Sequence, residues 1–118
     1  MGPEIICHLR YRLDPAKIEE FERYARIWVG LIRRYGGTHS GYFRAADGPA
    51  ASGFSFPGIG SPGPSDAAFA IFSFPDEQSY ENYRSSVRSD PECETAEAIL
   101  RDTNCFLAYE RTFVSRIA

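Results

Sequence analysis

The stretch EIICHLRYRL (residues 4–13) alternates between apolar and polar side chains. Successive side chains of a β-strand point to opposite faces, so this stretch predicts a strand with two unlike faces. One face carries the apolar set Ile5, Cys7, Leu9, Tyr11 and Leu13. The other face carries His8, Arg10 and Arg12, with Ile6 as the exception to the alternation. We expect the apolar face to pack against a second layer of the fold.

A long helix is predicted directly after this strand. Asp14 is a good N-cap and Pro15 suits the first helical position, while Gly36 and Gly37 end the helix. The helix therefore spans about residues 15–35. Its apolar side chains recur every three or four residues, which is typical of a buried stripe. This stripe is interpreted as core and consists of Ile18, Phe21, Ala25, Trp28, Ile32 and Tyr35.

The rest of the chain supplies three more strands and two shorter helices. Strands are predicted at residues 38–46, 67–75 and 105–114, and helices begin after the capping residues Asp76 and Asp90. The stretch 47–66 contains five Gly and four Pro in its 20 residues and has no periodicity. It therefore predicts a long loop between the second and third strands.

The element order β-α-β-β-α(α)-β predicts an α+β fold of the ferredoxin-like βαββαβ type, with a four-stranded antiparallel sheet. The length of 118 residues fits a single domain that spans residues 1–118. Helices then cover one face of the sheet and leave the other face bare. Two bare faces can pair, so we expect a homodimer that closes into an α/β barrel.

Charge and cysteine content exclude several classes of function. The net charge of −3 argues against a nucleic-acid partner, since phosphate contacts need a basic surface. No apolar run reaches the length of a membrane span, and we expect a cytoplasmic protein without a membrane partner. The three cysteines have no CxxC pair and predict reduced thiols.

The sequence also lacks the patterns of metal and cofactor sites. The two histidines and the scattered carboxylates do not have the spacing of metal ligands, so we expect no bound metal. No cofactor-binding motif occurs, so we expect no cofactor.

Four segments of the chain resemble the bacterial NIPSNAP-domain proteins of the dimeric α/β-barrel superfamily. They are GGTHSGYF (36–43), FSFPDEQSYENYR (72–84), SDPE (89–92) and CFLAYERTF (105–113). The resemblance covers nearly all of the chain except residues 47–66, which look like an insertion because family members commonly have a shorter link there. It implies the barrel and the dimer far more firmly than a reaction. Related barrels include cofactor-independent monooxygenases, haem-degrading enzymes and lactone isomerases.

The polar face of the first strand is one candidate site. In a barrel of this type the bare sheet face lines the shared lumen, so His8, Arg10 and Arg12 are predicted to face it. Guanidinium and imidazole groups in an enclosed site favour an organic anion. Alternatively, Arg10 and Arg12 pair with a carboxylate such as that of Glu110, or lie in solvent.

A second candidate site contains His39 and Tyr42. A histidine can act as a general base near neutral pH, and a tyrosine can bind a phenolate or carbonyl oxygen. A regular strand places the two side chains on opposite faces, unless a bulge at Gly41 intervenes. The alternative is structural, with a core histidine bonded to the backbone and a tyrosine packed on the helices.

The last strand and the loop supply the remaining candidates. Tyr109 and Arg111 share one face of that strand, and Glu110 lies on the other. The residues predicted to bind a ligand are Arg10, Arg12, Arg44, Tyr109 and Arg111, and the candidate catalytic residues are His8, His39 and Tyr42. Phe54 and Phe56 are predicted to cap a cavity or to dock on the partner subunit.

Three hypotheses of function follow from these residues. The first is a homodimeric barrel whose lumen binds a small aromatic or acidic organic molecule. The second is a cofactor-independent monooxygenase or isomerase, with His8 or His39 as the base and Tyr42 or Arg10 holding the developing oxyanion. The third is a non-catalytic interaction protein with a filled lumen. The sequence leaves open whether the protein is an enzyme.

Overall fold

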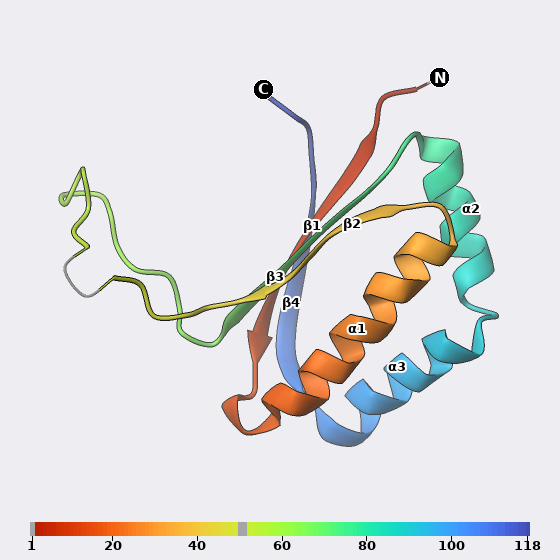
Figure 1. The fold of residues 1–118 in the computed structure, drawn as a ribbon, viewed down its shortest axis with the longest axis horizontal. Coiled ribbons are helices and arrows are strands. Elements are labelled where there is room, and N and C mark those ends of the chain that lie inside the picture. The colour runs from red at the N-terminus through yellow and green to blue at the C-terminus, as the bar shows by residue number, and fades with distance from the viewer. Residues whose placement is uncertain (1, 50–51) are drawn as a thin grey trace.

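The computed structural model, which describes residues 2–49 and 52–118, contains a four-stranded sheet with helices on one side (Figure 1). The strands are β1 (Ile5–Leu13), β2 (Thr38–Arg44), β3 (Ala67–Phe74) and β4 (Phe106–Val114). The α-helices are α1 (Ile18–Arg34), α2 (Glu77–Val87) and α3 (Pro91–Thr103), and a short 3-10 helix, Pro15–Lys17, precedes α1. Every predicted element is present, with its ends shifted by a few residues at most.

The strand order in the sheet is β2-β3-β1-β4, and every pair of neighbours is antiparallel. This arrangement confirms the predicted ferredoxin-like α+β fold. The order makes β1 a central strand, paired with β3 on one side and β4 on the other. Strand β1 therefore joins β4 to the β2-β3 pair in the sheet.

Aspartates start the helices where the sequence predicted. Asp14 accepts a hydrogen bond from the Ala16 N–H at 2.9 Å, and Asp76 accepts one from the Ser79 N–H at 2.8 Å. Asp90 also joins two helices, because it accepts hydrogen bonds from Arg34 at 2.6 Å and from the Tyr35 hydroxyl at 2.8 Å. These contacts fasten the end of α1 to the start of α3.

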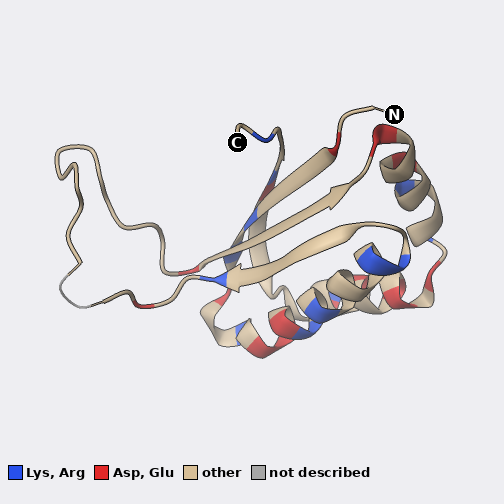
Figure 2. Ribbon diagram, turned by 45° about the horizontal axis from the view of Figure 1, so that its top comes forward, with Lys and Arg blue, Asp and Glu red and all other residues tan. Residues whose placement is uncertain are grey.

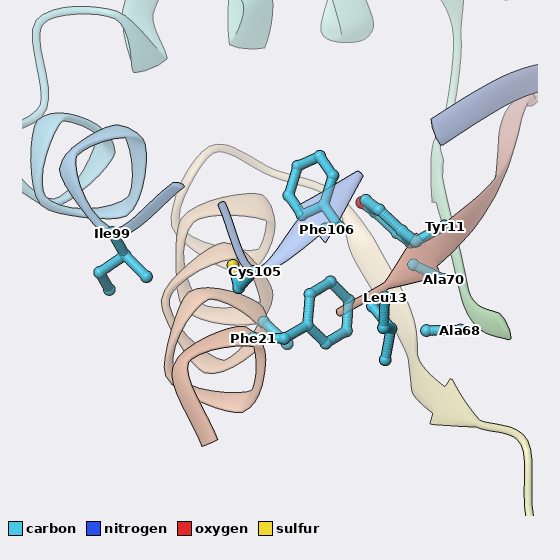
Figure 3. Packing of buried hydrophobic residues seen from close by; sticks show 9 residues of the cluster. Tyr11, Leu13, Phe21, Ala68, Ala70, Ile99, Cys105 and Phe106 are labelled. Carbon is cyan, nitrogen blue, oxygen red and sulfur yellow. The ribbon is translucent and has the colours of Figure 1, made fainter. Parts of the chain in front are cut away.

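The core lies between the sheet and the helices, as Figure 3 shows for one of its two clusters. There the ring of Tyr11 makes edge contacts with Phe21 and Phe106, at centroid distances of 5.1 and 5.0 Å. Leu9 and Ile27 pack against both clusters and so connect them. The apolar face of β1 therefore meets the helices, as its alternation predicted.

The second strand departs from regular alternation. Its register with β3 shifts between His39 and Gly41, so Ser40 is an extra residue in the ladder. Gly41 has a φ of 124°, which only glycine adopts without strain. The structure thus shows the alternative of a bulge at Gly41, and this bulge places His39 and Tyr42 on the same face. Their rings stack at a centroid distance of 5.1 Å.

The segment between β2 and β3 projects away from the sheet and the helices (Figure 1). Its charged residues are Asp47 and Asp66, one near each strand, so most of it is uncharged in Figure 2. Phe54 is 50% exposed and Phe56 is 73% exposed. The predicted loop is confirmed for its described residues, 47–49 and 52–66.

No helix in the described ranges 2–49 and 52–118 combines the length and the apolar character needed to cross a membrane. The helices instead place apolar residues on the side that faces the sheet and polar residues outside, as the charges in Figure 2 indicate.

Candidate functional site

The two faces of the sheet have different surroundings. The helices pack on the face that carries Leu9 and Tyr11 of β1. Within the described part of the chain no helix packs on the opposite face, to which His8, Arg10 and Arg12 belong (Figure 2). The predicted orientation of β1 is therefore confirmed, and each face can be assessed separately as a site.

A cavity of about 230 Å³ lies on the helix-covered face, between the sheet and the helices. Aromatic rings form most of its wall, namely those of Tyr11, Tyr24, Trp28, Tyr42, Phe72, Tyr80, Tyr83, Phe106 and Tyr109. Leu9, Ile32 and Leu100 complete the apolar lining. Its volume lies just below the usual range of about 300–1,000 Å³ for ligand pockets, which suits a small molecule of one or two rings. We call this space the aromatic cavity.

Two guanidinium groups, those of Arg84 on α2 and Arg111 on β4, also line the aromatic cavity. Both side chains are exposed, as is Tyr109, so these residues mark its mouth. Burial raises the pKa of the Cys7 thiol, while the positive charges of Arg111 and Arg84 act against that shift. Both guanidiniums are therefore near enough to Cys7 to act on its charge.

The charges at this mouth are not neutralised by neighbouring acids. Among the described residues, no carboxylate lines the aromatic cavity and none forms an ion pair with Arg84 or Arg111. Arg111 instead lies over the ring of Phe113, at 4.9 Å from its centroid. An anionic group at the mouth would therefore meet two guanidiniums that have no competing partner.

The tyrosine hydroxyls inside the cavity are neutral hydrogen-bonding groups. The hydroxyls of Tyr11 and Tyr42 lie 3.4 Å apart and form a hydrogen bond in which either can donate. Burial raises the pKa of Tyr11, Tyr24, Tyr42 and Tyr83 above its ordinary value. These groups therefore stay protonated at neutral pH and can orient an oxygen-bearing ligand.

His39 is held beside the cavity rather than in its wall. Its ring stacks on Tyr42 and on Phe72, both of which line the cavity. The Gly41 N–H donates to His39 Nδ1 at 2.9 Å, so a neutral ring carries its proton on Nε2. Burial and the nearby charge of Arg33 lower the pKa of His39 to about 4. At neutral pH the ring therefore has no free nitrogen with which to accept a proton.

The uncovered face holds the other predicted site residues in a different electrostatic setting. Arg10 forms an ion pair with Glu110, with Nη2 2.8 Å from Oε1, as the alternative interpretation expected. Arg10 and Arg12 border a separate cavity of about 360 Å³ that Glu110 and Asp66 also line. Two carboxylates there accompany two guanidiniums, so this cavity favours an anion less than the aromatic cavity does.

The structure therefore divides the predicted ligand and catalytic residues. Tyr42, Tyr109 and Arg111 come together in the aromatic cavity. His8 lies on the uncovered face, with its ring 6.1 Å from that of Phe69. Arg44 is exposed near the end of β2 and lines none of the three cavities described for the molecule.

Sequence reasoning missed the helical part of the wall. Tyr80, Tyr83 and Arg84 on α2 have the spacing i, i+3 and i+4, which places them on one side of a helix. Tyr24 and Trp28 on α1 show the same i, i+4 relation. Trp28 was interpreted as core, but it is half-buried and lines the cavity. An arginine beside two tyrosines on a helix face that meets the sheet is the signal that could have found this wall.

Two further candidates lie outside the cavities. Phe54 and Phe56 line none of the three described cavities, so neither caps one within this chain. No group of three or more His, Cys, Asp or Glu side chains in residues 2–49 and 52–118 is placed to hold a metal ion. The candidate site of the chain is therefore the aromatic cavity with Arg84 and Arg111 at its mouth.

Solved structures with the same fold place the chain among known proteins. No protein-family model and no curated protein matches its sequence. A NIPSNAP family protein of unknown function from Agrobacterium tumefaciens superimposes with a TM-score of 0.68 at 16% identity, over 99% of this chain and 93% of that one. The chain has the fold of NIPSNAP proteins.

Two other matches carry different descriptions. A proposed antibiotic biosynthesis monooxygenase from Nitrosomonas europaea has a TM-score of 0.64 at 11% identity, over 99% of this chain and 93% of that one. A dimeric ferredoxin-like protein of unknown function from Thermobifida fusca has a TM-score of 0.53 at 14% identity, over 98% and 93% of the two chains. At these identities the likeness to the NIPSNAP, monooxygenase and ferredoxin-like structures is one of fold.

Proposed function

We propose that this NIPSNAP-like protein binds a small aromatic acid in the aromatic cavity, with the acid group at Arg84 and Arg111. The observation that carries the proposal is the pairing of a ring-lined cavity with two guanidiniums that no carboxylate neutralises. Aromatic walls favour a flat apolar ligand, and charge-assisted hydrogen bonds from guanidinium groups favour a carboxylate or a related oxyanion. The ligand site is thus proposed between the sheet and the helices, and not in the barrel lumen that the sequence predicted.

Binding can be measured with 2-naphthoate as the probe, by titration calorimetry. We expect one saturable site per chain. Arg84→Gln and Arg111→Gln should each weaken binding about tenfold, because each removes a charge-assisted hydrogen bond. Arg12→Gln, on the uncovered face, is the matched control and should leave the affinity unchanged. The neutral analogue 2-naphthalenemethanol should bind weakly to all of these proteins. Equal losses with Arg12→Gln would contradict the proposed place of the site.

We propose binding rather than catalysis because none of the described residues that line the aromatic cavity offers a free base. Protonated tyrosines line it, and His39 uses Nδ1 as an acceptor for the Gly41 N–H. His8, the other candidate base, belongs to the opposite face of the sheet. These features disfavour a monooxygenase or isomerase mechanism that begins with proton removal by a histidine. The existence of an unfilled cavity likewise disfavours a purely structural interaction protein.

We further propose that the uncovered face pairs with a second copy to form a homodimer. The face carries apolar side chains next to its charges, with Phe43 54% exposed and Val114 40% exposed. Pairing with a second sheet would bury these groups. Sedimentation at micromolar concentration should give a 26 kDa species, about twice the 13.2 kDa of one chain. A compact monomer at all concentrations would contradict this proposal.

We also propose a family and a cellular location for the protein, each from a separate observation. The shared fold and the segments quoted from the sequence support a NIPSNAP-domain protein. All three cysteines are free and buried, which supports a reducing, cytoplasmic location.

A further inference from the structure

The cavity of about 360 Å³ that Arg10 and Arg12 border lies around the end of β1 and the starts of β3 and β4. Four of its lining side chains are charged, namely those of Arg10, Arg12, Asp66 and Glu110. The described lining therefore carries two positive and two negative charges and has no net charge. We call this space the charged cavity.

The four charges differ in whether they already have a partner. Arg10 and Glu110 neutralise each other in their ion pair. Arg12 and Asp66 form no ion pair, either with each other or with another of the described residues. Arg12 is exposed and Asp66 is half-buried. A ligand in the charged cavity can therefore reach one guanidinium and one carboxylate that are not neutralised.

The register of the sheet explains why Arg12 has no partner. Its neighbour in β3 is Ala67 and its neighbour in β4 is Ala108, and both alanines line the charged cavity. Arg10, in contrast, lies opposite Glu110 of β4. Directly opposed side chains are the closest neighbours that a strand residue has across a sheet. The two methyl groups beside Arg12 leave space and supply no charge, so its guanidinium stays available to a ligand.

The backbone holds Asp66 close to Arg12. The Asp66 carbonyl accepts a hydrogen bond at 2.8 Å from the N–H of Leu13, the residue that follows Arg12. Asp66 also directly precedes Ala67, the β3 neighbour of Arg12. The two groups are thus fixed at the same end of the sheet on adjacent strands. A molecule that contacts both needs an anionic and a cationic group.

We propose that the charged cavity binds a small aliphatic amino acid as its zwitterion, with the carboxylate at Arg12 and the ammonium group at Asp66. Both contacts are charge-assisted and therefore stronger than neutral hydrogen bonds. Ala67, Ala108 and Pro64 line the same cavity and offer apolar surface to an aliphatic side chain.

The balance of charge in the lining selects against ligands with a single charge. An anion at Arg12 also meets the two carboxylates, and a cation at Asp66 also meets the two guanidiniums. This site is separate from the aromatic cavity and does not depend on its proposed ligand. A second copy on the uncovered face would enclose the charged cavity, and the exclusion of water would strengthen both contacts.

The test uses three probes that share the leucine skeleton and differ in charge. At about pH 6.5, L-leucine is a zwitterion, N-acetyl-L-leucine is an anion and L-leucinamide is a cation. Titration calorimetry should show one site per chain for L-leucine. The other two probes should bind about tenfold more weakly or less, because each lacks one charge-assisted contact.

Two variants test the two assigned residues separately. Arg12→Gln should weaken L-leucine binding about tenfold and reduce the preference for L-leucine over L-leucinamide. Asp66→Asn should weaken it to a similar extent and reduce the preference over N-acetyl-L-leucine. Both variants should fold, since Arg12 is exposed and the backbone carbonyl of residue 66 is retained. Arg84→Gln, at the aromatic cavity, is the matched control and should leave L-leucine binding unchanged.

Three results would each overturn the proposed amino-acid site. The first is a lack of L-leucine binding at millimolar concentration. The second is equal affinity for the three probes, or L-leucine binding that neither Arg12→Gln nor Asp66→Asn weakens. The third is loss of L-leucine binding in Arg84→Gln, which would place the amino acid in the aromatic cavity. None of these results bears on binding of 2-naphthoate, so the proposed function is tested independently.

Discussion

The two faces of the sheet carry the same kinds of residue in opposite electrostatic arrangements. On the uncovered face, Arg10 is paired with Glu110, and Arg12 lies in a cavity that also contains Asp66. On the helix-covered face, Arg84 and Arg111 border an aromatic cavity without a carboxylate in its described lining. The difference teaches that arginine in a strand is a weak indicator of a ligand site until its neighbours are known. The absence of acids around a guanidinium is the more informative feature.

The largest effect is expected where the helix-covered face is fully buried. Leu13 is 1% exposed, and Leu13→Ala should lower the free energy of unfolding by about 2–5 kcal/mol through lost burial and a residual cavity. Val114 belongs to the uncovered face and is 40% exposed in the single chain, so in dilute protein, where no partner sheet covers it, Val114→Ala should cost less than about 1 kcal/mol. Urea unfolding of both variants checks the contrast. A similar cost at both positions would mean that the uncovered face is packed as tightly as the core.

The next largest effect is expected on stability at low pH, through the buried His39. The pKa of His39 is about 4 in the folded chain, against an ordinary value of 6.5. Between these values the unfolded chain binds more protons, so stability is full above pH 6.5 and falls as the pH drops toward 4. The loss should approach about 3 kcal/mol. His39→Gln should remove this loss from the pH profile of unfolding, whereas His8→Gln, on the opposite face, should retain it. A profile that keeps its slope in His39→Gln would contradict the assignment.

The fold was predictable because its signals are local. The alternation in residues 4–13 fixed both faces of β1, and Asp14, Asp76 and Asp90 marked the helix starts by hydrogen bonds within a few residues. The site was only partly predictable, because it depends on contacts between distant elements. Tyr42, Tyr109 and Arg111 were named as candidates and line the aromatic cavity, whereas the face of part of β2 depends on the bulge at Gly41, which the sequence allowed but did not require.

The part of the site wall on α2 was also not predictable from local sequence signals. Its tyrosines and Arg84 were visible on one helix face, yet nothing in the sequence says which part of the sheet that helix covers. Leu9 illustrates the point in the strand itself, since its position in the apolar alternation predicts core, whereas it is half-buried and lines the aromatic cavity. Alternation assigns a side chain to a face, but it does not say whether protein or a cavity lies against it.

A smaller effect is expected for the ion pair on the uncovered face. The side chains of Arg10 and Glu110 are 52% and 67% exposed in the single chain. Arg10→Ala should therefore lower the free energy of unfolding by about 0–1 kcal/mol in dilute protein, where such a pair is solvated. If a partner sheet buries the pair, the cost should rise with protein concentration toward about 3–5 kcal/mol, and Glu110→Ala should relieve part of it. A cost that stays small at all concentrations would show that the proposed dimer leaves this pair in solvent.

The smallest effect is expected from shortening the loop that leaves the sheet. The Ala45 N–H donates to the Ala67 carbonyl at 3.0 Å, so the ends of the loop lie next to each other and a four-residue turn can join them. Asp66 should be kept, because its carbonyl accepts a hydrogen bond from the Leu13 N–H at 2.8 Å. Replacing residues 47–65 by such a turn lowers the free-energy cost of loop closure by only about 1 kcal/mol. The melting temperature should therefore rise by a few degrees at most. Binding of 2-naphthoate should persist, since none of the described residues of the loop lines the aromatic cavity. Dissociation of the dimer in this variant would instead assign Phe54 and Phe56, which are exposed in the single chain, to the subunit interface.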